Sequence, residues 1–165
     1  MNTMIKDTPH ISIKDLLLAN KPLPDVSVRG WVRTVRSGKG FSFIEVNDGS
    51  TIRNVQIIAP ESLPDYAGIK SIPSGSSVEV RGNLAPSPAE GQSFELHASA
   101  ITVYGLADPE SYPLQKKRHS FEFLREIAHL RARSNTFGAG AGPRSELAFA
   151  VHDFFRARGF FYVHT

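Results

Sequence analysis

Hydrophobic residues recur with a period of two between residues 25 and 104, and this alternation constrains the fold more than any other feature of the sequence. In the first such segment Val26, Val28 and Val32 alternate with polar or charged neighbours, which indicates a strand with one buried and one exposed face. Asp48 and Gly49 form a typical hairpin turn between two further segments. The predicted strands begin at residue 25 and continue at residues 41–47, 52–59, 77–84 and 94–104.

The order of these segments favours a mainly β fold, a five-stranded OB barrel. Three strands come first, a proline-bounded crossover at residues 64–72 with room for a short helix follows, and two more strands complete the set. This order fits the OB fold. An SH3-like barrel is the main alternative, but the long insertion between the third and fourth strands makes it the less natural choice.

A short helix is predicted ahead of the barrel. Ser12 is a typical N-cap, Asp15 lies three residues later, and the apolar residues 16–18 follow. Asn20 and Pro22 end the segment. We expect this helix to plug the barrel or to cover one of its edges.

A longer helix is predicted to begin at Pro143, because Gly142 precedes it and Gly159 lies just past its end. Residues 121–131 are predicted to contain a further helix, and residues 160–163 to open a strand. An aromatic edge strand without a neighbour would be an aggregation hazard in a complete protein, so we expect the chain to be a fragment. The apolar stripe of the longer helix is Leu147, Ala150, Val151, Phe154 and Phe155.

Composition excludes several classes of protein. The chain has no cysteine, which rules out disulfides and thiolate ligands or nucleophiles. It has neither the roughly 18 consecutive apolar residues that span a bilayer nor an apolar secretory stretch, so we expect no membrane association and a cytoplasmic location. The histidines show no metal-ligand spacing, and no structural metal is predicted. Gly138, Gly140 and Gly142 lack the strand and the lysine of a phosphate loop, and are interpreted as a flexible connection.

Basic residues concentrate after the predicted strands. Lysines and arginines outnumber glutamates between residues 115 and 133, whereas the whole chain has a net charge of only +3. Such a segment suits a polyanion. A solvated charged face explains the same pattern equally well.

Strand parity predicts a surface for single-stranded nucleic acid. If the even-numbered residues of 41–47 and the odd-numbered residues of 52–59 face the core, aromatic and amide side chains face outward together. Rings stack on bases, amides hydrogen-bond base edges, and guanidinium groups hold phosphates. The alternative, given equal weight, is that the phenylalanines pack under the crossover or against a second domain. The outward set is Arg29, Arg33, Phe41, Phe43, Glu45, Asn54, Gln56 and Ile58.

Longer stretches resemble one enzyme family. The run YPLQKKRHSFEFLR from Tyr112, continued by HLRARSNTFGA, resembles the hinge between the anticodon-binding and catalytic domains of bacterial asparaginyl-tRNA synthetases. GWVRTVR, SFIEVNDG and NVQII resemble the first three strands of that group, and SELAFAVHDFFRARGFFYVHT resembles its first class II signature. The resemblance implies an N-terminal helical segment at 1–22, an OB-fold anticodon-binding domain at 23–107, a hinge at 108–135, and the truncated start of a class II α/β catalytic domain at 136–165.

The resemblance also implies site residues. Phe43 would stack on the central uracil of the anticodon, Gln56 would hydrogen-bond that base, and Arg36 would contact the base or its backbone. Arg36 faces outward only if the first strand bulges before Ser37. Glu95 would lie near the first anticodon base. Apart from the resemblance, strand parity makes Arg29 and Arg33 candidates for RNA-backbone contacts, and the basic segment adds Lys116, Lys117 and Arg118. The resemblance to the first class II signature makes four residues of the apolar helix stripe candidates for dimer contacts: Leu147, Val151, Phe154 and Phe155.

The family's full-length enzyme activates asparagine with ATP and Mg²⁺, transfers it to tRNA(Asn), and is a homodimer. Its ATP signatures are expected beyond residue 165, so we expect this chain to bind tRNA, to hold no cofactor and to catalyse nothing. The stretch from Gly138 to Pro143 departs from the family pattern and is expected to delay the helix and weaken the dimer. A free-standing OB module for single-stranded nucleic acid and a non-catalytic protein-interaction fragment remain the alternatives.

Overall fold

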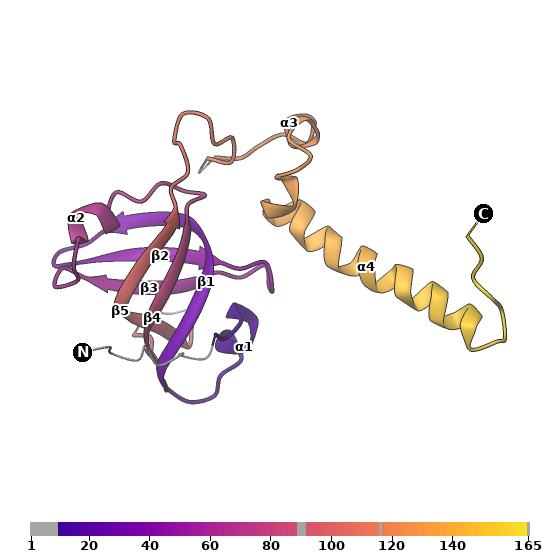
Figure 1. The fold of residues 1–165 in the computed structure, drawn as a ribbon, viewed down its shortest axis with the longest axis horizontal. Helices are drawn as coiled ribbons and strands as arrows, with labels where there is room; N and C mark the ends of the chain where they lie inside the picture. Colours follow the sequence, from indigo (N-terminus) through magenta and orange to yellow (C-terminus); the bar gives the residue numbers. More distant parts are fainter. Residues whose placement is uncertain (1–9, 89–91, 116, 165) are drawn as a thin grey trace, which may run out of the picture. The chain divides into compact units, whose positions relative to one another are not determined.

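The computed structural model describes residues 10–88, 92–115 and 117–164, and the chain divides into two compact units between Arg118 and His119. The first unit contains the strands, and the second contains the long C-terminal helix (Figure 1). The division falls within the predicted hinge at 108–135. Within the described ranges, no helix is both long and apolar enough to cross a membrane.

The first unit is a closed barrel with the strand order β1-β2-β3-β5-β4. Neighbouring strands pair antiparallel, except that β3 and β5 pair in parallel through Ile57 with Leu96 and Ile58 with His97. This topology confirms the predicted OB barrel. The strands are β1 (Leu23–Ser37), β2 (Phe41–Asn47), β3 (Val55–Pro60), β4 (Ser77–Pro86) and β5 (Phe94–Gly105).

The alternation of buried and exposed residues in β2 and β3 is as predicted. Even-numbered residues of β2 and odd-numbered residues of β3 are buried in one apolar core. The crossover contributes α2 (Tyr66–Ile69), whose Ile69 joins this core. Ahead of the barrel, α1 (Ile13–Leu17) buries Ile13 and Leu16 completely in the same core. The first helix therefore plugs the core, as its sequence predicts.

The turn between β2 and β3 ties α1 to the barrel. Ser12 caps the helix with its own side chain. Asp48 Oδ2 accepts a hydrogen bond from the backbone N–H of Ile13 at 2.8 Å, and Ser50 Oγ accepts one from that of Lys14 at 3.0 Å. Partial burial raises the pKa of Asp48, but hydrogen bonds from Ser50 and Ile13 outweigh burial and lower it. The negative charge of Asp48 is thus kept at the start of α1, where a helix favours it.

Shifts in strand register let the long strands bend. The β1–β2 ladder shifts its register between Val32 and Thr34, which marks a β-bulge. The β4–β5 ladder shifts between Arg81 and Gly82, where a Cβ on Gly82 would lie 2.0 Å from the carbonyl oxygen of His97. Only glycine allows backbones to approach this closely. Such bulges and glycine positions allow a twisted sheet to close on itself.

The second unit contains α3 (Phe121–Glu126), a 3₁₀ turn at Arg131–Arg133 and α4 (Asn135–Arg156). The helix predicted at 121–131 therefore ends early. The prediction that the long helix begins at Pro143 is wrong, because α4 starts at Asn135 and contains Pro143. The interpretation of Gly138, Gly140 and Gly142 as a flexible connection is wrong for the same reason.

A cap and tertiary contacts explain the early start of α4. Ser134 Oγ accepts a hydrogen bond from the N–H of Phe137 at 3.4 Å. The Phe137 ring packs edge-on to Phe121, with 5.9 Å between centroids, and lies 5.3 Å from the guanidinium carbon of Arg131. These contacts hold the first turn, although a proline inside a helix costs about 3 kcal/mol. A prediction from helix propensity alone does not include these contacts, and it therefore places the start of the helix later, at Pro143.

The strand predicted at residues 160–163 is also wrong, because residues 160–164 have no regular secondary structure. A strand needs a neighbour to satisfy its backbone N–H and C=O groups, and none of the described strands pairs with this segment. Gly159 does adopt a positive φ of 82° just past α4, which agrees with the predicted helix end.

Replacing Gly140 by alanine should stabilise α4 by about 1 kcal/mol, because glycine is the less favourable residue by that amount inside a helix. A Cβ at Gly140 would meet no atom within 4 Å. The measurement is helix content by circular dichroism during thermal unfolding. Gly138→Ala is the matched control with a smaller expected gain, since its Cβ would lie 2.9 Å from the carbonyl oxygen of Ala132. Equal gains at both positions would contradict this close approach of Gly138 to Ala132 at the start of α4.

Candidate nucleic-acid interface

The outward faces of β2 and β3 form the centre of the candidate interface. Phe43 pairs across the strands with Ile58, and Glu45 pairs with Gln56. All four side chains are partly exposed. The Phe43 ring lies outside the buried core and contacts Phe41 edge-on, with 5.0 Å between centroids. The parity prediction for these strands is therefore confirmed.

Arg36 lies next to Phe43 on β1, and the two residues are partners in the β1–β2 ladder. The register shift between Val32 and Thr34 supplies the bulge that an outward Arg36 requires. The Arg36 side chain is 54% exposed, and its Nη2 lies 3.4 Å from Oε1 of Glu45. Its guanidinium group is thus held only loosely, by Glu45.

Glu95 on β5 is the centre of a polar network beside Gln56. The residue is only 6% exposed. Its Oε2 accepts hydrogen bonds from Gln56 Nε2 at 3.4 Å, Ser87 Oγ at 3.1 Å and Gln92 Nε2 at 3.5 Å, and its Oε1 lies 3.0 Å from His97 Nε2. Because a buried carboxylate needs such partners, the network orients the Gln56 carboxamide. A direct contact of Glu95 with a base stays a prediction.

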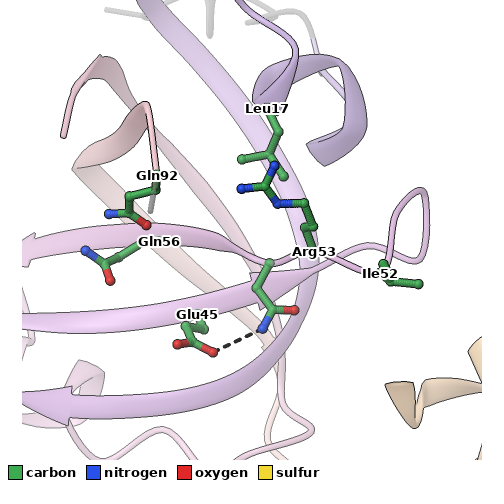
Figure 2. A pocket seen from close by; sticks show the side chains of 7 residues that line it. Leu17, Glu45, Ile52, Arg53, Gln56 and Gln92 are labelled. Atoms are coloured by element: carbon green, nitrogen blue, oxygen red, sulfur yellow. Dashed lines mark hydrogen bonds between the residues drawn. The ribbon is translucent and has the colours of Figure 1, made fainter. Parts of the chain in front are cut away.

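An open pocket of about 310 Å³ adjoins this network. Figure 2 shows Gln56 and Gln92 on one side of the pocket and Arg53 with Leu17 on another. Two of the lining residues are hydrogen-bonded to each other, because Asn54 Nδ2 donates to Glu45 Oε2 at 3.0 Å. The lining residues are Leu17, Glu45, Ile52, Arg53, Asn54, Gln56 and Gln92.

Arg29 is engaged with a buried carboxylate on β4. Glu79 is 5% exposed and lies 3.3 Å from Arg29 Nε and 3.0 Å from Arg81 Nε. Ser27 Oγ donates to it at 2.9 Å, and the Tyr104 hydroxyl donates to it as well. The Tyr104 bond, with those of Arg81 and Ser27 and the charge of Arg29, lowers the pKa of Glu79 to about 2 despite burial. Arg29 would have to share its guanidinium group with a phosphate, and this role stays a prediction.

The other predicted RNA contacts lie in β1 and in the segment that follows β5. Arg33 on β1 is partly exposed and takes part in an interaction, while Lys117 and Arg118 are exposed. Lys116 lies outside the described residues. The RNA-binding roles of these residues stay predictions.

The predicted dimer contacts lie on α4, which buries none of its residues. Leu147 is 66% exposed and Val151 is 49% exposed, and Phe154 and Phe155 are similarly open. Among the residues that the structure describes, no three His, Asp or Glu side chains gather where they could hold a metal ion.

Several residues of the interface were not assigned a role from the sequence. Glu45 and Asn54 were predicted only to face outward, and they do alternate onto the same face as Phe43 and Gln56. Ser87 and Gln92 lie in the segment between β4 and β5, where no period applies. Their part in the network depends on the return of this segment to Glu95.

Known sequences relate the chain to one domain family and one enzyme family. The family tRNA_anti-codon, described as an OB-fold nucleic acid binding domain, matches residues 26–104. The chain is 55% identical over 153 residues to an asparagine–tRNA ligase of Nitratidesulfovibrio vulgaris (strain DP4), and 55% identical over 154 residues to one of Nostoc sp. (strain PCC 7120). Each alignment covers 93% of this chain and 33% of the relative, so the chain spans about a third of the length of these curated relatives.

Solved structures share the fold. The asparaginyl-tRNA synthetase of Pyrococcus horikoshii complexed with asparaginyl-adenylate matches with a TM-score of 0.77 at 20% identity, over 93% of this chain and 36% of that chain. A putative aspartyl-tRNA synthetase from Leishmania major Friedlin matches with a TM-score of 0.79 at 20% identity, over 100% of this chain and 35% of that one. Residues 26–104 are therefore an OB-fold nucleic-acid-binding domain, and the chain is homologous over 93% of its length to asparagine–tRNA ligases, of which it spans about one third.

Proposed function

We propose that the chain is the anticodon-binding part of an asparagine–tRNA ligase, and that its barrel face recognises the central base of the tRNA(Asn) anticodon. The observation that carries this proposal is the partly exposed Phe43 ring on the same face as the Gln56 carboxamide, which Glu95 orients. An unpaired base stacks on an exposed ring while an amide hydrogen-bonds its edge. The two side chains supply both parts of such a contact.

Cations around this face would hold the RNA backbone. Arg36 can exchange Glu45 for a phosphate or a base, because a half-exposed ion pair at 3.4 Å contributes little to stability. The exposed Lys117 and Arg118, with Arg29 and Arg33 on β1, are further proposed contacts. Affinity should therefore fall as salt concentration rises.

The proposed activity of the full-length protein is the activation of asparagine with ATP and Mg²⁺ in the cytoplasm, followed by transfer to tRNA(Asn). In that reaction the part played by residues 26–104 is to position the tRNA. The described side chains do not converge on a metal-binding point, and no catalytic step is assigned to them. Bound elsewhere in the ligase, Mg²⁺ would neutralise phosphate charge.

Homodimer formation through α4 is part of the same proposal. The helix presents Leu147, Val151, Phe154 and Phe155 to solvent, and aromatic and aliphatic side chains of this kind form the centres of protein interfaces. A weakened dimer remains a proposal too. Its cause would be the low helix propensity of Gly138 to Pro143 inside a continuous α4, not a late helix start.

Anticodon stem-loop hairpins that differ only at the central base test the proposed function. We expect the hairpin with a central uracil to bind at least about tenfold more tightly than the other three, because each lost base contact costs about 1.4 kcal/mol or more. The measurement is fluorescence anisotropy at one fixed salt concentration. Equal affinity for all hairpins would favour a free-standing OB module. The absence of any affinity would favour a protein-interaction fragment.

A further inference from the structure

His97 is a half-exposed residue of β5 whose imidazole ring contacts the carboxylate of Glu95. Its Nε2 lies 3.0 Å from Oε1 of Glu95, whereas Gln56 binds the other oxygen, Oε2. We propose that His97 is a positioning residue for recognition of the central base: it holds the Glu95 carboxylate and, through that carboxylate, the orientation of the Gln56 carboxamide. The inference rests on the proposed function and adds to it a residue that acts through another side chain.

The backbone of His97 has a fixed place in the barrel. The residue pairs in parallel with Ile58 of β3 and antiparallel with Asn83 of β4. A Cβ on Gly82 would come within 2.0 Å of the His97 carbonyl oxygen, and only glycine allows so close an approach. A side chain on a fixed backbone loses little freedom when it forms a directed contact. His97 can therefore hold its neighbour in place before RNA binds.

The two carboxylate oxygens of Glu95 have different partners. Among the residues that the structure describes, His97 alone reaches Oε1. The donors to Oε2 are Gln56, Ser87 and Gln92, at 3.1 to 3.5 Å. An ionised carboxylate can only accept hydrogen bonds, so the Nε2 of His97 must carry the proton. Because Glu95 is only 6% exposed and buried oxygens need donors, its Oε1 depends on His97.

The bond that orients Gln56 is easily lost. At 3.4 Å it is long for a hydrogen bond, and within the described ranges it is the only one that the Gln56 side chain forms. Without His97 the Oε1 atom of Glu95 would lack a donor, and rotation of the carboxylate to find one would release Gln56. A carboxamide has a donor end and an acceptor end of similar size. A released Gln56 could then turn over and present either end to the RNA.

The orientation of Gln56 decides which pyrimidine it accepts. With Nε2 bound to Glu95, the carbonyl oxygen Oε1 remains to accept a hydrogen bond from a base. Uracil has an N–H group at ring position N3, whereas the N3 of cytosine only accepts. Both pyrimidines can stack on the Phe43 ring, because stacking tolerates any base. The preference for uracil over cytosine therefore depends on the amide orientation, and His97 should affect this selectivity more than the affinity itself.

The test compares anticodon stem-loop hairpins that have uracil or cytosine at the central position, at one fixed salt concentration. The unmodified chain should prefer uracil at least about tenfold. In His97→Ala this preference should fall at least about threefold, the effect of losing one oriented hydrogen bond. His97→Gln supplies an amide N–H donor of similar reach and should keep the preference within about twofold of that of the unmodified chain.

Ser99→Ala is the matched control. Ser99 is an exposed residue two positions further along β5, and its hydroxyl donates to the backbone carbonyl of Arg81 at 3.2 Å. This variant should change neither affinity nor preference, and thermal melts show that each variant is folded. If His97→Ala weakens both hairpins alike and leaves the preference unchanged, the inference is overturned. A His97→Gln variant that loses as much preference as His97→Ala also overturns it.

A second measurement uses the unmodified chain and does not depend on how the variants fold. Nitrogen NMR of the His97 imidazole should show the proton on Nε2, with slowed exchange of that proton with water, because the hydrogen bond to Glu95 protects it. A proton on Nδ1 alone, or unprotected exchange, overturns the role of His97 and leaves the proposed function standing. Equal binding of all central bases by the unmodified chain overturns the proposed function and this inference together.

Discussion

Replacement of Phe43 by alanine is expected to weaken binding of a tRNA(Asn) anticodon hairpin by roughly 5- to 150-fold, because stacking of one base on one aromatic ring contributes about 1 to 3 kcal/mol. The Phe43 ring is partly exposed on β2, so its removal leaves no cavity in the buried core. Folding stability should change much less than affinity. The measurement is the hairpin dissociation constant at fixed salt, paired with a thermal melt of the free chain.

Two control variants separate stacking from general damage to this face. Phe43→Tyr keeps an aromatic ring and should retain binding within about threefold, because stacking depends on the ring. Phe41→Ala removes the ring that contacts Phe43 edge-on at 5.0 Å. It should weaken hairpin binding less than Phe43→Ala does, because it removes only a contact that supports the Phe43 ring. An unchanged dissociation constant in Phe43→Ala would remove the physical basis of the proposed function.

Replacement of Glu79 by glutamine is expected to destabilise the folded chain by about 3 kcal/mol at pH 7, because it removes one partner of a buried charged network. Glu79 is 5% exposed and is bound by Tyr104, Arg81, Ser27 and Arg29. A depression of its pKa from 4.5 to about 2 corresponds to a stabilisation of about 3 kcal/mol by the ionised form. Denaturant unfolding of the two proteins measures the difference.

The same network predicts how stability depends on pH. The folded-state pKa of Glu79 lies below the unfolded value, so the unfolded chain binds the proton more readily. The contribution of the ionised Glu79 carboxylate to folding stability is complete above pH 4.5 and disappears as pH falls towards about 2. The stability gap between the native chain and Glu79→Gln should therefore narrow across that window. A gap that stays constant from pH 7 to pH 3 would show that the Glu79 charge does not produce it.

Arg29→Gln is the matched control for this prediction. The Arg29 side chain is 55% exposed, so solvent screens its pairing with Glu79. Three other groups still bind the carboxylate after its removal. The expected cost is about 1 kcal/mol or less, and RNA affinity in the same variant shows whether Arg29 also contacts a phosphate.

The elements that could be predicted were those whose pattern is local. The two-residue period places Phe43 and Gln56 outward on neighbouring strands, and Ser12 marks the start of α1. The start of α4 could not be predicted in this way. Its first turn depends on contacts of Phe137 with Phe121 and Arg131, and helix propensity contains no term for such contacts.

The sequence by itself determined the strand order, the inner and outer faces of β2 and β3, and the resemblance to asparaginyl-tRNA synthetases, because each depends on neighbouring residues or on a continuous run. Only the tertiary structure decided which polar groups meet. Gln56 and Glu95 are 39 positions apart in the chain and interact because barrel closure pairs β3 with β5. The pocket likewise exists because the β2–β3 turn holds α1 beside Arg53 and because Gln92 returns to Glu95. Hydrogen bonds between distant segments depend on the closed backbone geometry, which no local period encodes.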